Sequence, residues 1–389
     1  MKSTWTIAYL SGEDPRDKNA WSGTLYNMAA SLEAKGCVLI RVGPAKPIAA
    51  WLLCSLINKL SLLLLRKRFD YRHAAFYAKA YARLFSKRLQ NLQFDIVMAV
   101  GGSEYVAYLN TNKPVVLVVD RTVAGAIGYH QVLSNLLSWS QRQSVSTDAR
   151  AMQKTALNFF ASTWAQQAAL SYYQLEERKN VMVPFGANVA SLPSIEVLMH
   201  RTKETGICRL LFVGRDWKNK GGEMAVECLR VLKSKGIAAE LHIVGCSIPA
   251  GIHAAGLITH GFLDRNNQQQ GEQLHQLFID SHFFILPTRF EAYGLVFAEA
   301  AAYGLPALGP DTGGVSSAMC NGQTGILMSP HASGADYAYE IEKLWNDKSH
   351  WEEAIKKARQ LYDANLTWER WATQFLEATN QEIHSSNLR

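Results

Sequence analysis

Two segments in the second half of the chain hold residues whose types and spacing suit phosphate and sugar chemistry. In the first, residues 210–222 (LLFVGRDWKNKGG), an apolar run leads into a loop that carries Arg215 and Lys220. Free backbone amides at the start of a helix attract anions, and the helix dipole adds to this attraction. An Arg fork and a Lys point charge on one loop could hold a diphosphate, each charge-assisted bond contributing about 1.5 to 3 kcal/mol. The alternative is a solvated basic loop.

The second segment, residues 287–306 (PTRFEAYGLVFAEAAAYGLP), places Glu291 just after a predicted strand and Glu299 on the helix that follows. In open α/β sheets, ligands bind at the carboxyl ends of the strands, which is where Glu291 lies. Glu299 is surrounded by apolar residues, so its carboxylate needs a specific partner. A ribose diol would serve, and so would an Arg or Lys from a neighbouring helix. Backbone amides suited to phosphate are expected at Tyr293, Gly294 and Leu295.

The elements that must position these residues form two strand–helix series, because 389 residues with 48% hydrophobic content suffice for two separate cores. Apolar runs predict strands near residues 5–10, 38–42, 95–100 and 115–119 in the first series, and 209–213, 240–244, 283–286 and 305–308 in the second. Helices between successive strands imply parallel sheets. Pro, Ser and mixed charge interrupt the pattern at residues 187–206. We therefore predict α/β domains at 1–190 and 206–368, joined by a linker at 191–205.

The order of these motifs resembles that of a known family. A Glu-x7-Glu pair lies between Pro-Thr and Ala-x-Gly-x-Pro, and D-T-G-G-V (311–315) and N-G-x-T-G (321–325) follow it. The loop F-V-G-R-D-W-x-x-K-G-G and the segment P-F-G-A-N (184–188) precede it. Together these motifs resemble family 4 of the GT-B glycosyltransferases, the glycosyl transferases group 1, across roughly residues 159–328. The resemblance implies two Rossmann-like domains facing each other across a cleft, with a C-terminal helix, 369–389, that returns to the N-terminal domain.

The resemblance also implies roles for particular residues. Arg215 and Lys220 would grip the donor diphosphate, Glu291 would contact the donor sugar near the reacting carbon, and Glu299 would hold the nucleotide ribose. Gly23, in W-S-G-T, would approach the diphosphate from the N-terminal domain, although the family commonly has Gly-Gly there. Trp368 and Trp371 on the last helix would be packing residues.

The acceptor side departs from the family pattern. Many relatives carry a histidine after P-V-V-x-x-x, whereas this chain reads P-V-V-L-V-V and then Asp120-Arg121. Asp120 is therefore a candidate catalytic residue near the acceptor, or alternatively a helix-capping residue at a strand end. His130 is a second candidate for the acceptor or sugar.

The implied activity is that of a retaining hexosyl-type glycosyltransferase using a nucleotide-diphosphate sugar, with UDP as the commonest nucleotide of the family. No metal or other cofactor is expected, since the sequence has no Asp-x-Asp. We expect the donor to bind the C-terminal domain first, after which domain closure would exclude water. The alternatives are a nucleotide-sugar epimerase or sugar phosphorylase on the same fold, or a non-catalytic nucleotide-sugar-binding protein. A dehydrogenase is disfavoured because no G-x-G-x-x-G follows a strand.

Charge is unevenly distributed along the chain. Residues 1–190 hold 22 Lys and Arg against 11 Asp and Glu, whereas residues 191–389 hold 18 against 22, so the positive excess behind the net charge of +7 lies in the first half. Residues 46–88 hold ten basic residues and one acidic residue, interleaved with aromatics. This segment could lie on an anionic membrane surface, or form a core helix with a solvated basic face. Within it, residues 48–65 are long enough to span a bilayer, but Asn58 and Lys59 near the middle argue against spanning.

Other features bear on partners and location. No nucleic-acid-binding module accompanies the positive charge. The acceptor, whether a glycan, a lipid-linked molecule, a small molecule or a protein, is not specified by the motifs. The six cysteines lie at least 17 positions apart, which argues for a reducing compartment, and the N-terminus lacks the apolar region of a signal peptide. We therefore predict a cytoplasmic protein, peripheral at the inner face of the membrane if residues 46–88 contact it.

Overall fold

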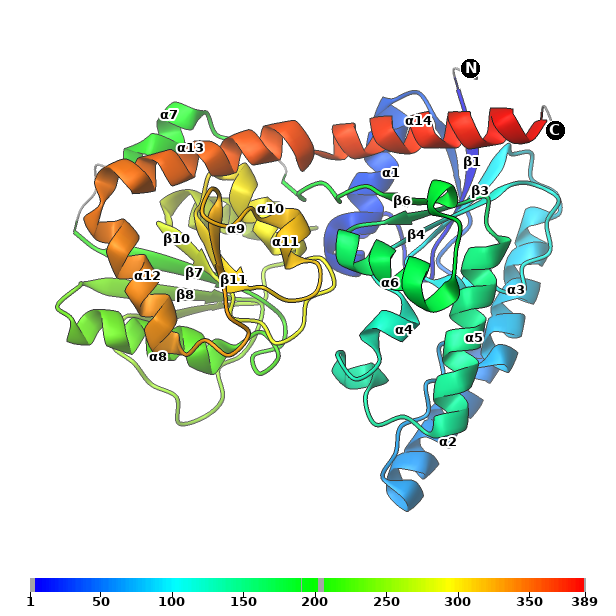
Figure 1. Ribbon diagram of the computed structural model, residues 1–389, viewed down its shortest axis with the longest axis horizontal. Helices are drawn as coiled ribbons and strands as arrows, with labels where there is room; N and C mark the ends of the chain where they lie inside the picture. The colour runs from blue at the N-terminus through cyan, green and yellow to red at the C-terminus, as the bar shows by residue number, and fades with distance from the viewer. Residues whose placement is uncertain (1–3, 190, 202–205, 388–389) are drawn as a thin grey trace. The chain divides into compact units, whose positions relative to one another are not determined.

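The computed structural model describes residues 4–189, 191–201 and 206–387, which divide into two compact units. Unit 1 comprises Met1–Pro184 with Trp368–Arg389, and unit 2 comprises Phe185–Thr367. Each unit is a parallel sheet with its own helices (Figure 1).

Among the described residues, unit 1 contains a six-stranded parallel sheet in the order β2-β1-β3-β4-β5-β6. Its strands are β1 (Thr6–Leu10), β2 (Val38–Arg41), β3 (Ile96–Val100), β4 (Val115–Val119), β5 (Leu157–Phe160) and β6 (Asn180–Met182). Every residue of β3 and β4 is buried, as their unbroken apolar sequences predict for strands covered on both faces. Because β1, β3 and β4 are neighbouring parallel strands, the loops that follow them lie at one edge of the sheet.

The helices of unit 1 cover both faces of this sheet. They are α1 (Thr24–Ala34), α2 (Ile48–Leu65), α3 (Ala75–Leu89), α4 (Val123–Ala126), α5 (Ser138–Lys154), α6 (Thr163–Tyr173) and α14 (Trp368–Asn387). Short 3-10 turns lie at η1 (Ala20–Gly23), η2 (Ser103–Tyr105), η3 (Gln131–Leu133) and η4 (Glu177–Lys179). One apolar cluster joins a face of the sheet to α3, α5 and α6. On the other face, the Tyr9 hydroxyl donates to the Leu25 carbonyl of α1 at 3.0 Å.

Helix α14 belongs to unit 1 although it ends the chain. Its Phe375 lies 4.9 Å from Phe159 of β5 between ring centroids, and its Asn380 accepts a hydrogen bond from the Trp5 indole at 3.2 Å. Trp368 and Trp371 are buried, as expected for packing residues. The C-terminal helix thus covers the N-terminal sheet, as the family resemblance implies.

Unit 2 contains, within the described part of the chain, a six-stranded parallel sheet in the order β12-β11-β10-β7-β8-β9. Its strands are β7 (Cys208–Val213), β8 (Ala239–Val244), β9 (Leu257–Gly261), β10 (Phe283–Ile285), β11 (Ala307–Pro310) and β12 (Gly325–Met328). Strands β7 and β10 are neighbours, with Leu210 paired to Phe283. The two loops with candidate site residues therefore leave the sheet side by side.

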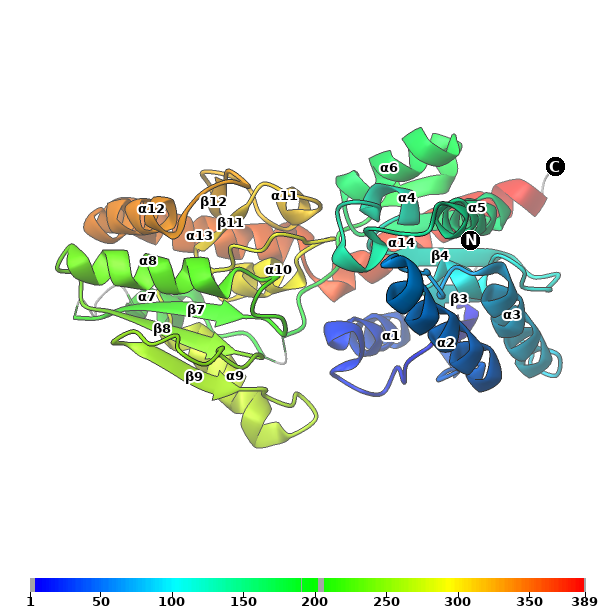
Figure 2. The same cartoon turned by 90° about the horizontal axis from the view of Figure 1, so that it is seen from below.

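The helices of unit 2 are α7 (Ile195–His200), α8 (Gly222–Ser234), α9 (Gln268–Asp280), α10 (Leu295–Ala302), α11 (Val315–Ala318), α12 (Gly334–Asn346) and α13 (Lys348–Asn365). Helices α8 and α12 pack side by side (Figure 2). Helix α12 begins with a capping box, in which Ser333 and Asp336 satisfy each other's backbone amides.

The segment predicted as a linker is largely part of unit 2. Helix α7 lies inside residues 191–205, and its Leu198 is fully buried. Arg201, also buried, donates to the Tyr303 carbonyl at 3.0 Å, close to the end of α10. Residues 190 and 202–205 lie outside the described residues. The Pro and Ser residues thus surround a short packed helix, and the boundary between the units falls earlier, at Phe185.

A buried ion pair fixes the turn between α2 and α3. The His73 ring lies 2.8 Å from the Asp70 carboxylate, and the Asp70 amide donates to the hydroxyl of Ser140 on α5. Burial opposes the charge on both side chains, but their mutual attraction prevails. It raises the pKa of His73 to about 9 and lowers that of Asp70 to about 2.

We predict that the His73→Gln variant loses less stability at alkaline pH than the native chain does. Because its folded pKa is raised, His73 contributes fully below its unfolded pKa of about 6.5, and this contribution is lost as pH rises through about 9. The free energy of unfolding of the native chain should fall by on the order of 2 kcal/mol more than that of the variant between pH 6 and pH 10. Urea denaturation at several pH values measures this difference. The exposed His253→Gln is the control, and parallel curves for native chain and His73→Gln would contradict the prediction.

Candidate active site

The loop after β7 forms the first wall of the site. It runs from Gly214 to Gly221, and α8 begins at Gly222. The Lys220 amide donates to the Asp216 carbonyl at 2.9 Å, and the Asp216 carboxylate accepts from the Asn219 amide at 3.0 Å. These bonds curl the loop so that Lys220 leaves it just before the amino end of α8.

The loop after β10 forms the second wall and is joined to the first through its backbone. The Arg289 amide donates to the Asn219 carbonyl at 2.8 Å, and the Thr288 hydroxyl donates to the same oxygen at 3.1 Å. At Gly221 the φ angle is +77°, and a β-carbon there would lie 2.0 Å from the Pro287 carbonyl oxygen. Only glycine permits this approach of the two loops.

Lys220 and Glu291 meet across the two loops. The Lys220 ammonium lies 2.5 Å from the Glu291 carboxylate, and both side chains are partly exposed. The predicted donor-binding residue Lys220 and the predicted catalytic residue Glu291 are thus brought together, and their charges neutralise each other. A partly exposed pair of this kind contributes little to stability, so an anion could displace Glu291 from Lys220 at small cost.

Glu299 is buried on α10 and pairs with an arginine that the sequence did not single out. The Arg265 guanidinium donates to one carboxylate oxygen at 2.8 Å and to the Asn188 carbonyl at 2.9 Å. Burial alone would lower the pKa of Arg265, but the charge of Glu299 reverses the shift and raises it. The other oxygen, Oε1, is buried and has no hydrogen-bond partner within the described residues. The structure therefore supplies a basic partner, from the loop between β9 and α9 rather than from a neighbouring helix, and leaves one oxygen unused.

Arg215 lies on the same loop as Lys220 and is exposed. Its guanidinium carbon is 5.0 Å from the ring centroid of Phe262, which follows β9. Phe262 is half exposed and was not predicted as a site residue. Its signal in the sequence is a large aromatic residue directly after a strand, at the edge where ligands bind.

Helix α10 begins where it was predicted to begin, but the Tyr293 side chain makes a structural contact instead of facing a ligand site. Its hydroxyl donates to the Phe185 carbonyl at 2.8 Å, and its ring packs against the Phe185 ring. Gly294 precedes α10 with a φ angle of +86°. Any phosphate contact from this turn would therefore come from backbone amides at Gly294 and Leu295.

Gly23 lies in unit 1, in a strained turn that caps α1. Its φ angle is +91°, and the two preceding residues, Trp21 and Ser22, are also left-handed, with φ angles of 45° and 59°. Non-glycine residues rarely adopt this conformation, which costs about 1 to 3 kcal/mol each and is concentrated at functional sites. The Trp21 amide donates to the carboxylate of Glu13, on the loop after β1. The chain thus obtains a left-handed turn here without the Gly-Gly of the family.

Asp120 and His130 lie on the segment that follows β4, with different local partners. Asp120 lies 3.4 Å from Arg121 and is partly exposed. His130 Nδ1 accepts a hydrogen bond from the Val132 amide at 3.0 Å and so caps η3. Asp120 does not cap the helix that follows, since Thr122 does so.

Sequence reasoning did not find a buried carboxylate at the same edge of the unit 1 sheet. Glu104 follows β3 in η2 and is 6% exposed. Burial raises its pKa, while the positive charges of His73 and Arg72 oppose the increase. The signal was a Gly-Gly-Ser-Glu sequence directly after a predicted strand. In the structure, Gly101 has a φ angle of +79°.

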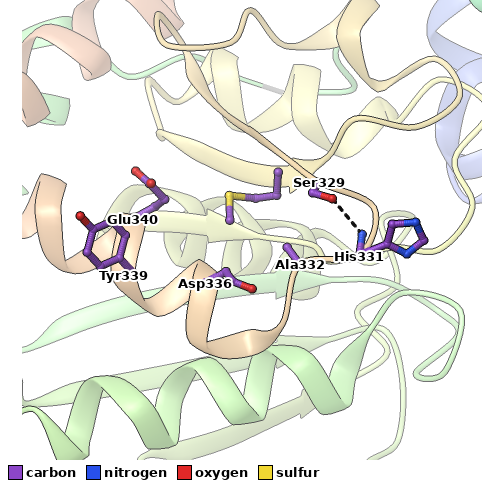
Figure 3. A pocket seen from close by; sticks show the side chains of 7 residues that line it. Ser329, His331, Ala332, Asp336, Tyr339 and Glu340 are labelled. Atoms are coloured by element: carbon purple, nitrogen blue, oxygen red, sulfur yellow. Dashed lines mark hydrogen bonds between the residues drawn. The ribbon is translucent and has the colours of Figure 1, made fainter.

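Neither of two cavities at the β10–β12 side of unit 2 is lined by Lys220, Glu291 or Glu299. One, of about 360 Å³, lies against Pro287, Thr312 and Tyr337. The other, of about 400 Å³, is drawn in Figure 3, where the His331 amide donates to the Ser329 hydroxyl at 3.2 Å. Within the described residues, no three or more His, Cys, Asp or Glu side chains are grouped so that they could hold a metal ion.

Residues 202–361 match the family described as glycosyl transferases group 1. A D-inositol 3-phosphate glycosyltransferase from an Arthrobacter species is 29% identical over 199 residues, which cover 47% of this chain and 46% of that protein. The match therefore spans about half the length of this relative, as it does for others of the same name.

Two solved structures have the same fold over nearly the whole chain. A sucrose-phosphate synthase from Thermosynechococcus elongatus is 15% identical with a TM-score of 0.68, covering 99% of this chain and 100% of its own. HepE from Anabaena, solved in complex with UDP-glucose, is 13% identical with a TM-score of 0.65, covering 97% of this chain and 100% of its own. The two parallel sheets with their helices are thus the two-domain α/β fold that the sequence predicted.

We predict that Gly221→Ala destabilises unit 2 far more than Gly236→Ala. Both glycines have positive φ angles, but a β-carbon at residue 236 meets nothing within 4 Å, whereas at residue 221 it meets the Pro287 carbonyl. The expected losses are about 1 kcal/mol at residue 236 and about 3 kcal/mol or more at residue 221. Denaturant unfolding of the two variants measures the difference. Equal losses would mean that the two loops are not held together at this point.

Proposed function

Since residues 202–361 match the glycosyl transferases group 1 family, we propose that the protein transfers a hexosyl group from a nucleotide-diphosphate sugar to an acceptor. The proposal includes retention of configuration, no metal requirement and UDP as the nucleotide. The observation that carries it is the meeting of Lys220 and Glu291 across the loops that follow two neighbouring strands.

The donor diphosphate is assigned to Lys220, Arg215 and the amides at the starts of α8 and α10. Lys220 precedes α8, and Gly294 and Leu295 begin α10, so two helix amino ends face the edge where strands β7 and β10 end. As the bond between the sugar and the diphosphate breaks, negative charge develops on the leaving phosphate. Fixed positive charge stabilises that change without reorganisation, and this is the main catalytic role proposed for Lys220.

Glu291 is assigned to the donor sugar. When phosphate oxygens take over the Lys220 ammonium, the Glu291 carboxylate is released from that ammonium and could contact sugar hydroxyls or stabilise positive charge at the reacting carbon. The diphosphate and the sugar are joined by a single bond, so residues that now touch each other would contact neighbouring groups of one ligand.

Glu299 is assigned to the nucleotide ribose. Arg265 occupies one of its carboxylate oxygens, while Oε1 has no hydrogen-bond partner among the described residues. A ribose hydroxyl could donate to this oxygen once the donor is seated. Because an unpartnered buried oxygen is costly, such a bond would be strongly favoured over its absence.

UDP is supported by the solved complexes of HepE with UDP and with UDP-glucose. The acceptor is assigned to unit 1, where Asp120, Glu104 and the turn at Gly23 follow strands or begin a helix at one edge of the sheet. A location in the cytoplasm stays a prediction, with all six cysteines free.

The nucleotide can be identified by a thermal-shift screen of nucleoside diphosphates and their sugars. A ligand at 100 times its dissociation constant stabilises the folded chain by about 2.7 kcal/mol. UDP and UDP-sugars are expected to raise the melting temperature, and a response to another nucleotide alone would overturn the choice of UDP. Product analysis then separates transfer from epimerisation, which needs no acceptor, and from phosphorolysis, which needs inorganic phosphate.

Replacing Lys220 by Ala is expected to weaken UDP binding by about 10- to 100-fold, the loss of one charge-assisted hydrogen bond of about 1.5 to 3 kcal/mol. Sugar transfer should fall by at least as much, since the ammonium also stabilises the leaving phosphate. Calorimetric titration with UDP and a transfer assay give the two quantities. Lys218→Ala, an exposed lysine of the same loop, is the matched control. Equal affinities in the two variants would refute the role of Lys220.

We predict that the Glu299→Gln variant no longer distinguishes UDP from an analogue that lacks the ribose hydroxyls. The native chain should bind UDP at least about 10-fold more tightly than 2′,3′-dideoxy-UDP, because the charged hydrogen bond from the diol to the carboxylate is worth about 1.5 kcal/mol or more. In the variant this ratio should approach one, whereas a purely structural role would weaken both ligands alike. If the ratio of the two affinities were the same in the variant as in the native chain, Glu299 would not bind the ribose.

A further inference from the structure

Helix α2 presents its apolar side chains to the outside of unit 1. Its exposed large residues include Ile48, Leu52, Leu53, Leu56, Leu60, Leu63 and Leu64, and Leu63 is 77% exposed. Only 11% of the helix is buried. At 100° per residue, these seven positions fall on one side of the helix.

Asn58 and Ser61 of α2 face inward instead, whereas Lys59 is exposed. Asn58 accepts a hydrogen bond from the Phe69 amide at 2.9 Å, and the Ser61 hydroxyl donates to the Lys67 carbonyl at 2.6 Å. Cys54 and Ser61 are the buried residues of the helix. This arrangement is the reverse of a surface helix of a water-soluble domain, where apolar residues face the core.

The surface around α2 is exclusively positive within residues 46–88 of the described chain. The only acidic residue there, Asp70, is buried and paired with His73. Lys59, Arg66 and Lys67 are exposed on the helix or directly after it. A second copy of this chain would bring like charges together, whereas a surface of anionic phospholipid complements both the apolar side chains and the charge.

An aromatic residue extends this surface beyond the helix. The Arg68 amide donates to the Asn135 carbonyl and the Leu137 amide donates to the Arg68 carbonyl, both at 2.9 Å, which ties residues 66–68 to residues 135–137. Close by, Trp139 is half exposed and lies 5.3 Å from Phe69 between ring centroids. Tryptophan is enriched at the boundary between lipid and water.

By length and composition, α2 is the one helix among the described residues that could cross a membrane. A membrane-spanning position of α2 conflicts, however, with the way in which the chain connects this helix to the sheet. The chain enters α2 from β2 and returns through α3 to β3, and β2 and β3 both pair with β1 in one sheet. The bonds of Asn58 and Ser61 to residues 67–69 would also be broken. A position parallel to the surface keeps all of these contacts, and Figure 1 shows α2 extending to one end of unit 1.

We propose that α2 docks on an anionic phospholipid bilayer, with its outward leucines in the headgroup region and Lys59, Arg66 and Lys67 against the lipid phosphates. The helix lies along the surface and the rest of unit 1 stays in water. This surface belongs to unit 1 and shares no residue with the donor site assigned to unit 2, so membrane docking does not depend on the proposed transfer reaction.

The full chain can be tested by sedimentation with vesicles of phosphatidylcholine alone or mixed with phosphatidylglycerol. The native chain should bind the mixed vesicles, and added salt should weaken this binding. Leu56→Glu combined with Leu63→Glu should reduce binding by about 10-fold or more, since charges on the inserted face oppose burial in lipid. Lys59→Gln combined with Lys67→Gln should reduce binding to mixed vesicles and weaken its dependence on salt. Tyr172→Glu, at an exposed aromatic residue of α6, is the control and should bind as the native chain does.

Circular dichroism and UDP binding should be unchanged in these variants, which separates loss of docking from misfolding or loss of the donor site. Equal binding by the native chain and the double leucine variant would overturn the proposal. A dimer that forms without lipid, and that becomes a monomer when Leu56→Glu is combined with Leu63→Glu, would also overturn the proposal. In that case the exposed face of α2 would pack against a second copy of the chain. Retention of the native chain in cell membranes after alkaline carbonate extraction would also contradict it, since that result requires a helix that spans the bilayer.

Discussion

The ion pair between Lys220 and Glu291 is the interaction on which the account of the site depends. It joins the loops that follow two adjacent parallel strands, at a distance of 2.5 Å. Those loops are already locked together through Asn219 and the close approach at Gly221, so the pair need not hold the structure. Its partial exposure means that it contributes little to folding. In the proposed reaction it keeps a cation in position until the phosphates of the donor replace the carboxylate.

The pair between Glu299 and Arg265 is of a different kind, because Glu299 is almost fully buried. Removing either partner would leave an uncompensated charge in an apolar region, which typically costs several kcal/mol. The hydrogen bond from Arg265 to the Asn188 carbonyl also ties the P-F-G-A-N segment to α10. One charged pair is therefore suited to exchange with a ligand, and the other is suited to holding a fixed carboxylate beside it.

Local sequence patterns predicted β1 to β4, β7, β8, β10 and β11, and the placement of Lys220, Glu291 and Glu299 after or beside particular strands, but they did not predict β5, β6, β9 or β12. They could not identify Arg265, because it lies 34 positions from Glu299 and follows a different strand, so no spacing along one element joins them. The short helix α7 was missed because Pro and Ser around it indicate a loop, whereas burial of Leu198 stabilises it. In α2, Cys54, Asn58 and Ser61 recur at helical spacing and mark one face. Only the structure reveals that this face points inward, since nothing in the sequence of a single helix specifies which side meets the core.

The most direct test of the exchange at Lys220 is a calorimetric comparison of UDP, UMP and uridine binding to the native chain. If the outer phosphate of UDP displaces Glu291 from Lys220, UDP should bind at least about 10-fold more tightly than UMP, the equivalent of one charge-assisted hydrogen bond. Equal affinities for UDP and UMP would contradict the account, because the Lys220–Glu291 pair would then remain closed and no diphosphate would occupy this site.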